Sequence, residues 1–406
     1  MRLNTQRAVR ARDSAPRAER RGGKRRPATR LLPGFRIGHA SDFRGLTGCT
    51  VILTEGGAVC GVDVRGSAAG TRDLAACLPG HIVERVHAVF LTGGSAFGLD
   101  AAAGVMRYLE SRRVGFPAGK VRVPIVPAAV IFDLNLGSAR ARPTADMAYQ
   151  ACRSASSEVA EGCVGAGTGA TVGKLFGIRS AMKGGAGFCS CTMTAASASA
   201  SSQKQREDAE VASGTVVVQA FVVVNAFGDV VDPATGIIVA GTRASPASTR
   251  LVGTAEEMLR GKTRRSFGAT NTTLAVVMTN AALTKLQATK VAQMAQDGLA
   301  RALRPVHTPF DGDLVFALSM GTDRADLSAL GTAAAEAVAQ AILRAVRSSA
   351  SLGGLPSLTD GAGFGRRSTW QPLMSFCDSR KTAGTPVRNE ILAAPSRLPP
   401  SLKRRG

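Results

Sequence analysis

The chain has 406 residues, of which 45% are hydrophobic, and a formal net charge of +22. This is enough apolar material for a large core, in one big domain or two. The sequence has no run of about eighteen apolar residues and opens without an apolar signal core. We therefore expect no membrane span and no secretion, and a cytoplasmic location.

The positive charge is concentrated at the two ends of the chain. Residues 1–30 carry a net +9 and residues 350–406 carry +6, which leaves +7 for the 319 residues between them. Both ends are rich in Arg, Ser, Gly and Pro, which predicts disordered basic tails at 1–30 and 350–406 around a single domain at 31–349. Charge confined to such tails argues against a specific nucleic-acid function. The Arg-rich, acid-poor start also resembles an organelle transit peptide, although it lacks an apolar helical face.

Eight cysteines are scattered along the chain without a regular framework. This predicts reduced, mostly buried thiols. Cys189-Ser190-Cys191 is too tight for a usual zinc pair, and the four histidines are far apart in the sequence. We therefore predict no metal site and no cofactor.

Two short apolar runs open the predicted domain. Residues 49–53 and 58–62 are joined by Thr54-Glu55-Gly56-Gly57, which predicts a β-hairpin. Residues 86–91 read as a buried strand, followed by a glycine turn and a helix over 99–110. The turn has the spacing G-x-S-x-x-G around Ser95, which departs from both the serine-hydrolase elbow and the known phosphate loops. A tight turn that lets the helix pack close to the sheet is the favoured interpretation.

A glycine-rich block lies between residues 162 and 177. It contains Gly165-Ala166-Gly167-Thr168-Gly169-Ala170-Thr171-Val172-Gly173-Lys174, with one lysine and four glycines. Glycine permits close backbone approach, so Lys174 would sit in a cramped site where its charge is used or its pKa is lowered. A solvated loop lysine is an equally good interpretation of this stretch alone.

The middle of the chain alternates between predicted loops and strands. Residues 192–213 predict a flexible surface loop and 243–268 a polar, basic linker. Residues 215–224 predict a long strand that ends at Asn225, and residues 230–240 are expected to continue the sheet.

The second linker leads directly to Asn271-Thr272, followed by the apolar run 273–278. The run reads as a buried strand that begins with a hydroxyl residue. If Thr272 became the first residue of a new chain, its α-amine would titrate near pH 7.7–8.0 and could serve as the base for its own hydroxyl. That is the chemistry of N-terminal-nucleophile hydrolases.

Two helices and an acidic turn complete the predicted domain. Residues 283–303 and 326–346 predict amphipathic and Ala-rich helices, and residues 314–318 a strand. Asp311-Gly312-Asp313 offers too few ligands for calcium and reads most simply as a turn, with catalytic carboxylates as the alternative. Strands and helices mix without a regular βαβ alternation, which predicts an α+β fold with two central sheets covered by helices.

Taken together and in this order, six short motifs resemble one family of self-processing peptidases. The family comprises the L-aminopeptidase/D-esterases, the β-peptidyl aminopeptidases and the nylon-oligomer (6-aminohexanoate) hydrolases, and the resemblance covers roughly residues 33–348. The motifs are Gly93–Ala102, Gly165–Lys174, Lys183-Gly184-Gly185, Val223-Val224-Asn225-Ala226, Asn271-Thr272-Thr273 and Phe310-Asp311-Gly312-Asp313.

The resemblance implies a four-layer α-β-β-α sandwich that cleaves itself between Asn271 and Thr272. Thr272 would be the nucleophile, and Lys174 would hold or activate its hydroxyl and amine. Asn225 would steady the oxyanion with its side-chain amide. Asp311 and Asp313 would orient the nucleophile through Lys174 or through the new α-ammonium.

Two departures from the family pattern stand out. Members of the family carry a tyrosine where this chain has Phe132, and the connection over residues 189–213 is longer here. If the tyrosine hydroxyl contributes to the oxyanion site, its loss would lower activity or shift that task to Asn225.

The resulting hypothesis is an amidohydrolase or aminopeptidase that works through an acyl-Thr272 intermediate. Its substrate would be a short peptide, a β- or D-amino acid amide, or an ω-amino acid oligomer. The fragments 1–271 and 272–406 would stay together, and the resemblance implies a homo-oligomer. An acyl transferase of the ornithine acetyltransferase type and a catalytically degenerate, small-molecule-binding relative are the alternatives.

Overall fold

The fold is organised by one long strand that belongs to two halves of a sheet. A computed structural model describes residues 30–194, 215–262 and 271–360. Within them, the strand β2 (Thr47–Val64) pairs through its first part with β1 (Arg36–Asp42) and β4 (Val86–Thr92). Its last residues pair with β16 (Leu314–Asp323). β2 therefore joins the two halves into one hydrogen-bonded sheet.

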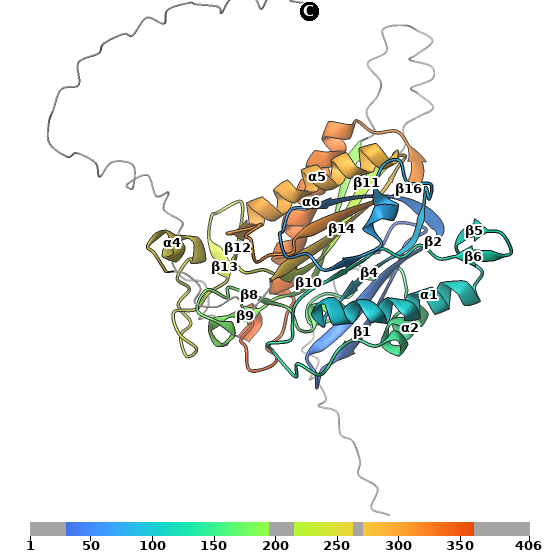
Figure 1. The fold of residues 1–406 in the computed structure, drawn as a ribbon. Coiled ribbons are helices and arrows are strands. Elements are labelled where there is room, and N and C mark those ends of the chain that lie inside the picture. Colours follow the sequence, from blue (N-terminus) through green and yellow to red (C-terminus); the bar gives the residue numbers. More distant parts are fainter. Residues whose placement is uncertain (1–29, 195–214, 263–270, 361–406) are drawn as a thin grey trace, which may run out of the picture. The chain divides into compact units, whose positions relative to one another are not determined.

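The described residues contain a nine-stranded sheet in the order β10-β11-β14-β16-β2-β4-β7-β3, with β1 added beside β2 (Figure 1). The remaining members are β10 (Gly185–Thr194), β11 (Thr215–Asn225), β14 (Thr272–Ala281), β7 (Ala128–Val130) and β3 (Thr71–Arg72). The pairs β14–β16 and β4–β7 are parallel, whereas the other pairs are antiparallel.

Three separate hydrophobic cores show that these elements form four layers. Successive strand residues point to opposite faces of a sheet. In β14, Ala275 and Val277 accordingly join the core with α5 (Lys285–Ala302) and α6 (Leu327–Arg347), whereas Leu274 and Val276 join the core between the two sheet halves. On the far side, β2 and β4 pack against α1 (Ala102–Ser111) and α2 (Ala145–Arg153). The predicted α-β-β-α sandwich is confirmed (Figure 1).

The two long C-terminal helices begin where the sequence places cap residues. Thr284 forms a capping box with Gln287 at the start of α5, and the Asp326 side chain accepts a hydrogen bond from Ala329 N–H at the start of α6. Such caps satisfy N–H groups that have no partner inside the helix. Both helices predicted from the sequence are confirmed.

Smaller elements surround the sandwich. β12 (Asp229–Val231), β13 (Ile238–Ala240) and β15 (Leu303–Arg304) form a second sheet, and β5 (Phe116–Ala118) pairs with β6 (Val121–Val123). β8 (Thr171–Val172) pairs with β9 (Met182–Lys183). The short helices are η1 (Leu74–Cys77), η2 (Ser95–Ala101), η3 (Gly165–Gly167), η4 (Ile178–Ser180), α4 (Thr254–Leu259) and η5 (Leu358–Asp360).

The predicted hairpin at residues 54–57 is wrong. β2 continues through these residues, because both flanking segments pair with the same strand β4, at Leu53–Ala88 and Ala58–Val86, with a bulge between them. The expectation that 230–240 continues the main sheet is also wrong, since β12 and β13 pair with β15 instead.

The predicted tail and linker boundaries also need correction. Residues 350–360 are not a disordered tail, since Leu355 and Ser357 are buried and Pro356 C=O accepts a hydrogen bond from Lys183 N–H. The predicted linker 243–268 includes the helix α4 and the buried Arg243. Residues 1–29, 195–214, 263–270 and 361–406 lie outside the described residues, together with the predictions made for them.

Cysteine usage agrees with the prediction of reduced thiols over the described residues. Seven cysteines there are free, and four of them are buried. Those same residues hold no group of three or more His, Cys, Asp or Glu side chains suited to a metal ion. α6 has the length and apolarity of a membrane span, but 67% of that window is buried inside the protein, as it is in a core helix.

The close contact between α5 and β2 at Gly61 leads to a testable prediction about stability. A Cβ there would lie 2.1 Å from the nitrogen of Thr289 and 2.3 Å from the carbonyl carbon of Ala288. Since backbone must move to admit it, Gly61→Ala should lower the free energy of unfolding by about 1–3 kcal/mol in urea denaturation. Gly56→Ala is the control, because its Cβ would meet only Met320 Cε at 3.6 Å. Equal stability of the two variants would contradict this packing.

Candidate active site

The Asn271–Thr272 bond lies at the entry of β14, between two neighbouring strands. Thr272 faces Asn225 across the antiparallel pair β11–β14, and Asn271 forms a parallel bridge with Asp311 just before β16. Asn271 is fully buried and Thr272 is 3% exposed. The bond is thus fixed by pairing on both sides.

Within the described residues, two groups donate hydrogen bonds to the carbonyl oxygen of Asn271. Thr272 Oγ1 donates to it at 2.5 Å and Gly312 N–H at 2.7 Å. Asn271 N–H in turn donates to Phe310 C=O at 2.9 Å. The backbone on both sides of Asp311 therefore holds Asn271.

Gly312 is required sterically at this place. A Cβ on it would lie 2.8 Å from Thr272 Oγ1 and 3.0 Å from Ala68 C=O. The missing side chain lets the Gly312 amide approach the Asn271 oxygen while the Thr272 hydroxyl stays beside it. When a hydroxyl attacks a carbonyl carbon, negative charge develops on that carbonyl oxygen, and a fixed N–H donor stabilises it.

Lys174 and Asn225 meet next to Thr272. Lys174 Nζ donates to the side-chain oxygen of Asn225 at 2.8 Å and to its main-chain oxygen at 2.9 Å. Thr171 N–H donates to the same side-chain oxygen at 3.0 Å. Lys174 is 5% exposed, so the sequence-based interpretation of a cramped lysine is confirmed and the solvated-loop alternative is wrong.

The side-chain nitrogen of Asn225 donates to Phe132 C=O at 3.0 Å. One of its two N–H groups is therefore engaged with main chain rather than with the Asn271 oxygen. The acceptor belongs to the backbone of Phe132, so this contact does not depend on a tyrosine hydroxyl at that position. Within the described residues, the donors to the Asn271 oxygen are Gly312 and Thr272, and the oxyanion role of Asn225 stays a prediction.

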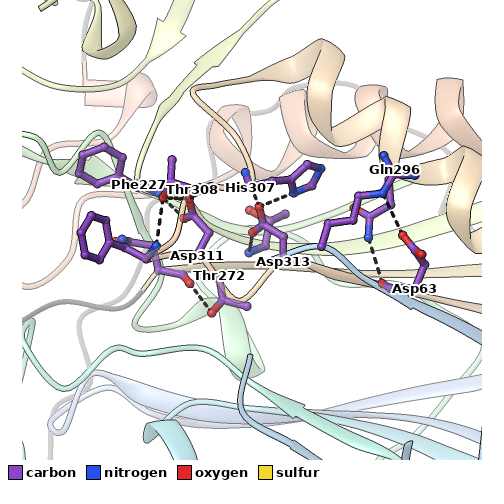
Figure 2. A network of polar contacts seen from close by, with 12 residues as sticks. Asp63, Phe227, Thr272, Gln296, His307, Thr308, Asp311 and Asp313 are labelled. Atoms are coloured by element: carbon purple, nitrogen blue, oxygen red, sulfur yellow. Dashed lines mark hydrogen bonds and ion pairs between the residues drawn. The ribbon is translucent and has the colours of Figure 1, made fainter. Parts of the chain in front are cut away.

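Asp313 holds the backbone next to Thr272. One carboxylate oxygen accepts from Thr273 N–H at 2.6 Å, and the other accepts from His307 N–H at 3.2 Å and contacts His307 Nδ1 at 3.0 Å. Figure 2 shows His307 beside Asp313, on the side away from Thr308. Asp313 thus reaches Thr272 through the following peptide group.

Asp311 lies on the other side of Gly312 and is also buried (Figure 2). Its carboxylate accepts hydrogen bonds from Phe227 N–H at 3.3 Å, from Thr308 N–H at 3.0 Å and from Thr308 Oγ1 at 2.5 Å. Burial, followed by the nearby charge of Asp313, raises the pKa of Asp311 from 3.8 to about 6.

The structure therefore brings Thr272, Asn225 and Lys174 together, with Asp311 and Asp313 flanking Gly312. In the uncleaved chain the two carboxylates accept hydrogen bonds from main-chain N–H groups and contact Thr308 and His307. Their action through Lys174 or through a new α-ammonium stays a prediction.

Sequence reasoning missed Gly312 and His307. The donor at Gly312 is a main-chain N–H group, which every residue except proline has, so the residue type does not reveal it. His307 stands only four residues before Asp311, which was the available hint.

Comparisons with known proteins identify the family of the chain. The family model described as peptidase family S58 matches residues 32–358. An uncharacterized aminopeptidase of Mycobacterium tuberculosis is 39% identical over 364 residues, which cover 80% of this chain and 95% of the relative. A 6-aminohexanoate-oligomer endohydrolase of Paenarthrobacter ureafaciens is 31% identical over 334 residues, covering 77% and 84%.

Two solved structures share the fold. The L-aminopeptidase D-Ala-esterase/amidase of Ochrobactrum anthropi, described as a variant of the Ntn hydrolase fold, matches with a TM-score of 0.58 at 17% identity, over 79% of this chain and 86% of that one. A β-aminopeptidase of a Burkholderia species matches with a TM-score of 0.55 at 22% identity, over 80% and 89%.

The raised pKa of Asp311 predicts a pH-dependent stability. Because ionisation costs more in the fold than in the unfolded chain, the contribution of Asp311 is fully present below its ordinary pKa of 3.8 and is lost as the pH rises through about 6. Between about pH 4 and pH 7, the unfolding free energy of the wild type should fall by about 2–3 kcal/mol relative to Asp311→Asn. Urea denaturation at several pH values measures this, with the exposed Asp100→Asn as control; a constant difference would contradict the assignment.

Proposed function

Because the chain belongs to peptidase family S58 and is a hydrolase of the aminopeptidase type, we propose that Thr272 is its nucleophile, freed when the chain cleaves itself after Asn271. One observation carries the proposal: the Thr272 hydroxyl and the Gly312 amide both bind the carbonyl oxygen of Asn271. The attacking group and an oxyanion donor are therefore already in place around a single carbonyl.

The first reaction is an N→O acyl shift. Thr272 Oγ1 gives up its proton and attacks the carbonyl carbon of Asn271, while the Gly312 N–H stabilises the oxyanion. The C–N bond then breaks, the Thr272 nitrogen takes the proton, and an ester joins Asn271 to Thr272 Oγ1. Water hydrolyses this ester and leaves an Asn271 carboxylate and a free Thr272 α-amine.

The second reaction uses the same hydroxyl on a substrate amide. The α-amine accepts the hydroxyl proton, Oγ1 attacks the substrate carbonyl, and the substrate amine leaves with a proton. Water then releases the acyl group from Thr272. A fixed N–H donor to the developing oxyanion contributes about 3 kcal/mol in sites of this kind.

The neighbouring side chains take supporting roles in this proposal. The Lys174 ammonium beside Asn225 provides positive charge near the reacting oxygen. Within the described residues, one N–H of the Asn225 amide has no acceptor, so it is available to a substrate oxyanion. Asp313 fixes Thr273, and through it the position of the nucleophile.

Both fragments would remain together after cleavage. Thr272 begins the strand β14, which lies between β11 and β16 inside the sheet and is buried from residue 272 to 279. The fragment 272–406 therefore keeps its pairing with the fragment 1–271. Relatives are named as aminopeptidases and as 6-aminohexanoate-oligomer hydrolases, so we propose short peptides, β- or D-amino acid amides and ω-amino acid oligomers as candidate substrates.

Substitution of Thr272 tests the nucleophile. Thr272→Ala should leave a single full-length band on a denaturing gel and should abolish amide hydrolysis, because no hydroxyl remains. Thr272→Ser retains a hydroxyl and should give two bands and measurable activity. Two bands from Thr272→Ala would show that another group cleaves the chain.

Substitution of Gly312 tests the geometry at the carbonyl. The methyl group of Gly312→Ala would lie 2.8 Å from Thr272 Oγ1, so the hydroxyl must move. A misplacement of a reacting group by about 1 Å can slow a reaction by about 100-fold. We therefore expect self-cleavage of Gly312→Ala to be ~10- to 100-fold slower than that of the wild type in a gel time course. Gly56→Ala, distant from the site, should cleave at the wild-type rate. Unchanged cleavage in Gly312→Ala would contradict the arrangement.

A further inference from the structure

We propose that Lys183 and Asp133 form a buried pair of opposite charges that positions the Asn225 side chain beside Thr272. Neither residue touches the scissile bond, so both are positioning residues. The inference rests on the proposed function. It adds two buried charged side chains that act on the site through the residues between.

Lys183 holds one side of the glycine-rich block. Its side chain is buried, and Nζ donates to Thr168 C=O at 2.8 Å and Ala170 C=O at 2.7 Å. Its backbone lies opposite Thr171 in the β8–β9 pair, and the next residue, Gly184, donates to Ala170 C=O at 3.0 Å. Residues 168–170 are therefore fixed by this lysine and its strand.

Asp133 packs against the same short segment. A Cβ on Gly169 would lie 2.5 Å from Asp133 Cβ and 2.6 Å from Asp133 Oδ2. The carboxylate is 5% exposed and accepts from Thr47 Oγ1 at 2.7 Å and from Gly94 N–H at 2.8 Å. Asp133 therefore packs against Gly169, and Lys183 binds the carbonyl groups of the residues on either side of it.

Burial is the largest influence on the pKa of each group, and the opposite charge of the other group is a smaller influence that opposes it. Burial lowers the pKa of Lys183 to about 8, and Cys163 and Asp133 oppose that shift. Burial raises the pKa of Asp133, and hydrogen bonds from Gly94 and Thr47 oppose the rise together with the charge of Lys183. Removing one member of a buried pair leaves the other uncompensated, whereas removing both does not.

Both ends of the Asn225 amide connect to this pair through adjacent backbone. Thr171, which follows Ala170, donates to the Asn225 side-chain oxygen from N–H at 3.0 Å and from its hydroxyl at 3.3 Å. Phe132, which precedes Asp133, accepts from the Asn225 side-chain nitrogen at 3.0 Å. A shift of the glycine block against residues 132–133 would therefore turn the amide that faces Thr272.

A pH effect follows from this arrangement. As the pH rises through about 8, Lys183 loses its proton and Asp133 is left without its opposite charge. Hydrolysis should therefore decline on the alkaline side. The Thr272 α-amine acts in the opposite sense, because its loss of a proton near pH 7.7–8.0 makes it a competent base and raises activity.

The test compares the wild type with Lys183→Met, Asp133→Asn and the double variant Lys183→Met/Asp133→Asn. We expect kcat to fall at least tenfold in Lys183→Met with little change in KM, because the substitution disturbs the amide that stabilises the transition state. The double variant should recover most of that loss and should no longer show the alkaline decline. Lys285→Met is the matched control: this buried lysine donates to Ala76, Leu78 and Val83 carbonyls outside the site, so its loss should lower the melting temperature and leave kcat unchanged.

Melting temperatures of the same proteins report on the pair independently of activity. The double variant should melt above Lys183→Met, or above Asp133→Asn if Lys183→Met does not fold. A double variant that is no more active than Lys183→Met, or that melts no higher than either single variant, would overturn the inference. Wild type that neither cleaves itself nor hydrolyses amides would instead refute the proposed function. The comparison of melting temperatures would still show whether Lys183 and Asp133 stabilise each other.

Discussion

The proposed chemistry depends on two hydrogen bonds to one oxygen atom. The Asn271 carbonyl oxygen is held by the Gly312 amide and by the Thr272 hydroxyl, and this arrangement requires the parallel alignment of β14 with β16. The same alignment brings Asp311 opposite Asn271 and the Asp313 carboxylate to the N–H of Thr273. In the proposed chemistry, sheet register therefore places the Gly312 amide at the carbonyl that Thr272 would attack.

The layers of the sandwich place the supporting residues at the same point. Thr272 and Asn225 continue the strand faces that carry Leu274 and Val223 into the core between the sheet halves. The glycine-rich block reaches them because its backbone can approach closely: Gly169 lies against Asp133 and Gly173 against Gly241. Charged groups brought into this interior are bound to backbone carbonyls or amides, which offsets the cost of removing them from water.

Much of this could be predicted from the sequence, because local patterns carry it. The helix periodicity of α5 and α6 and the apolar run of β14 predicted these elements correctly. The continuity of β2 could not be predicted, since Gly56-Gly57 has the local signature of a turn and only the pairing with β4 shows a bulge. The Gly312 donor and the contacts of Lys183 with carbonyl groups are equally invisible, because main-chain partners far apart in sequence leave no trace in residue type.

The most direct test of the account is the intact mass of purified, active protein together with sequencing of its amino termini. We expect two chains, one ending at Asn271 and one whose first residues are Thr-Thr-Leu-Ala. A single chain with the Asn271–Thr272 bond intact in protein that hydrolyses amides would contradict the account, because Thr272 would then have no terminal amine.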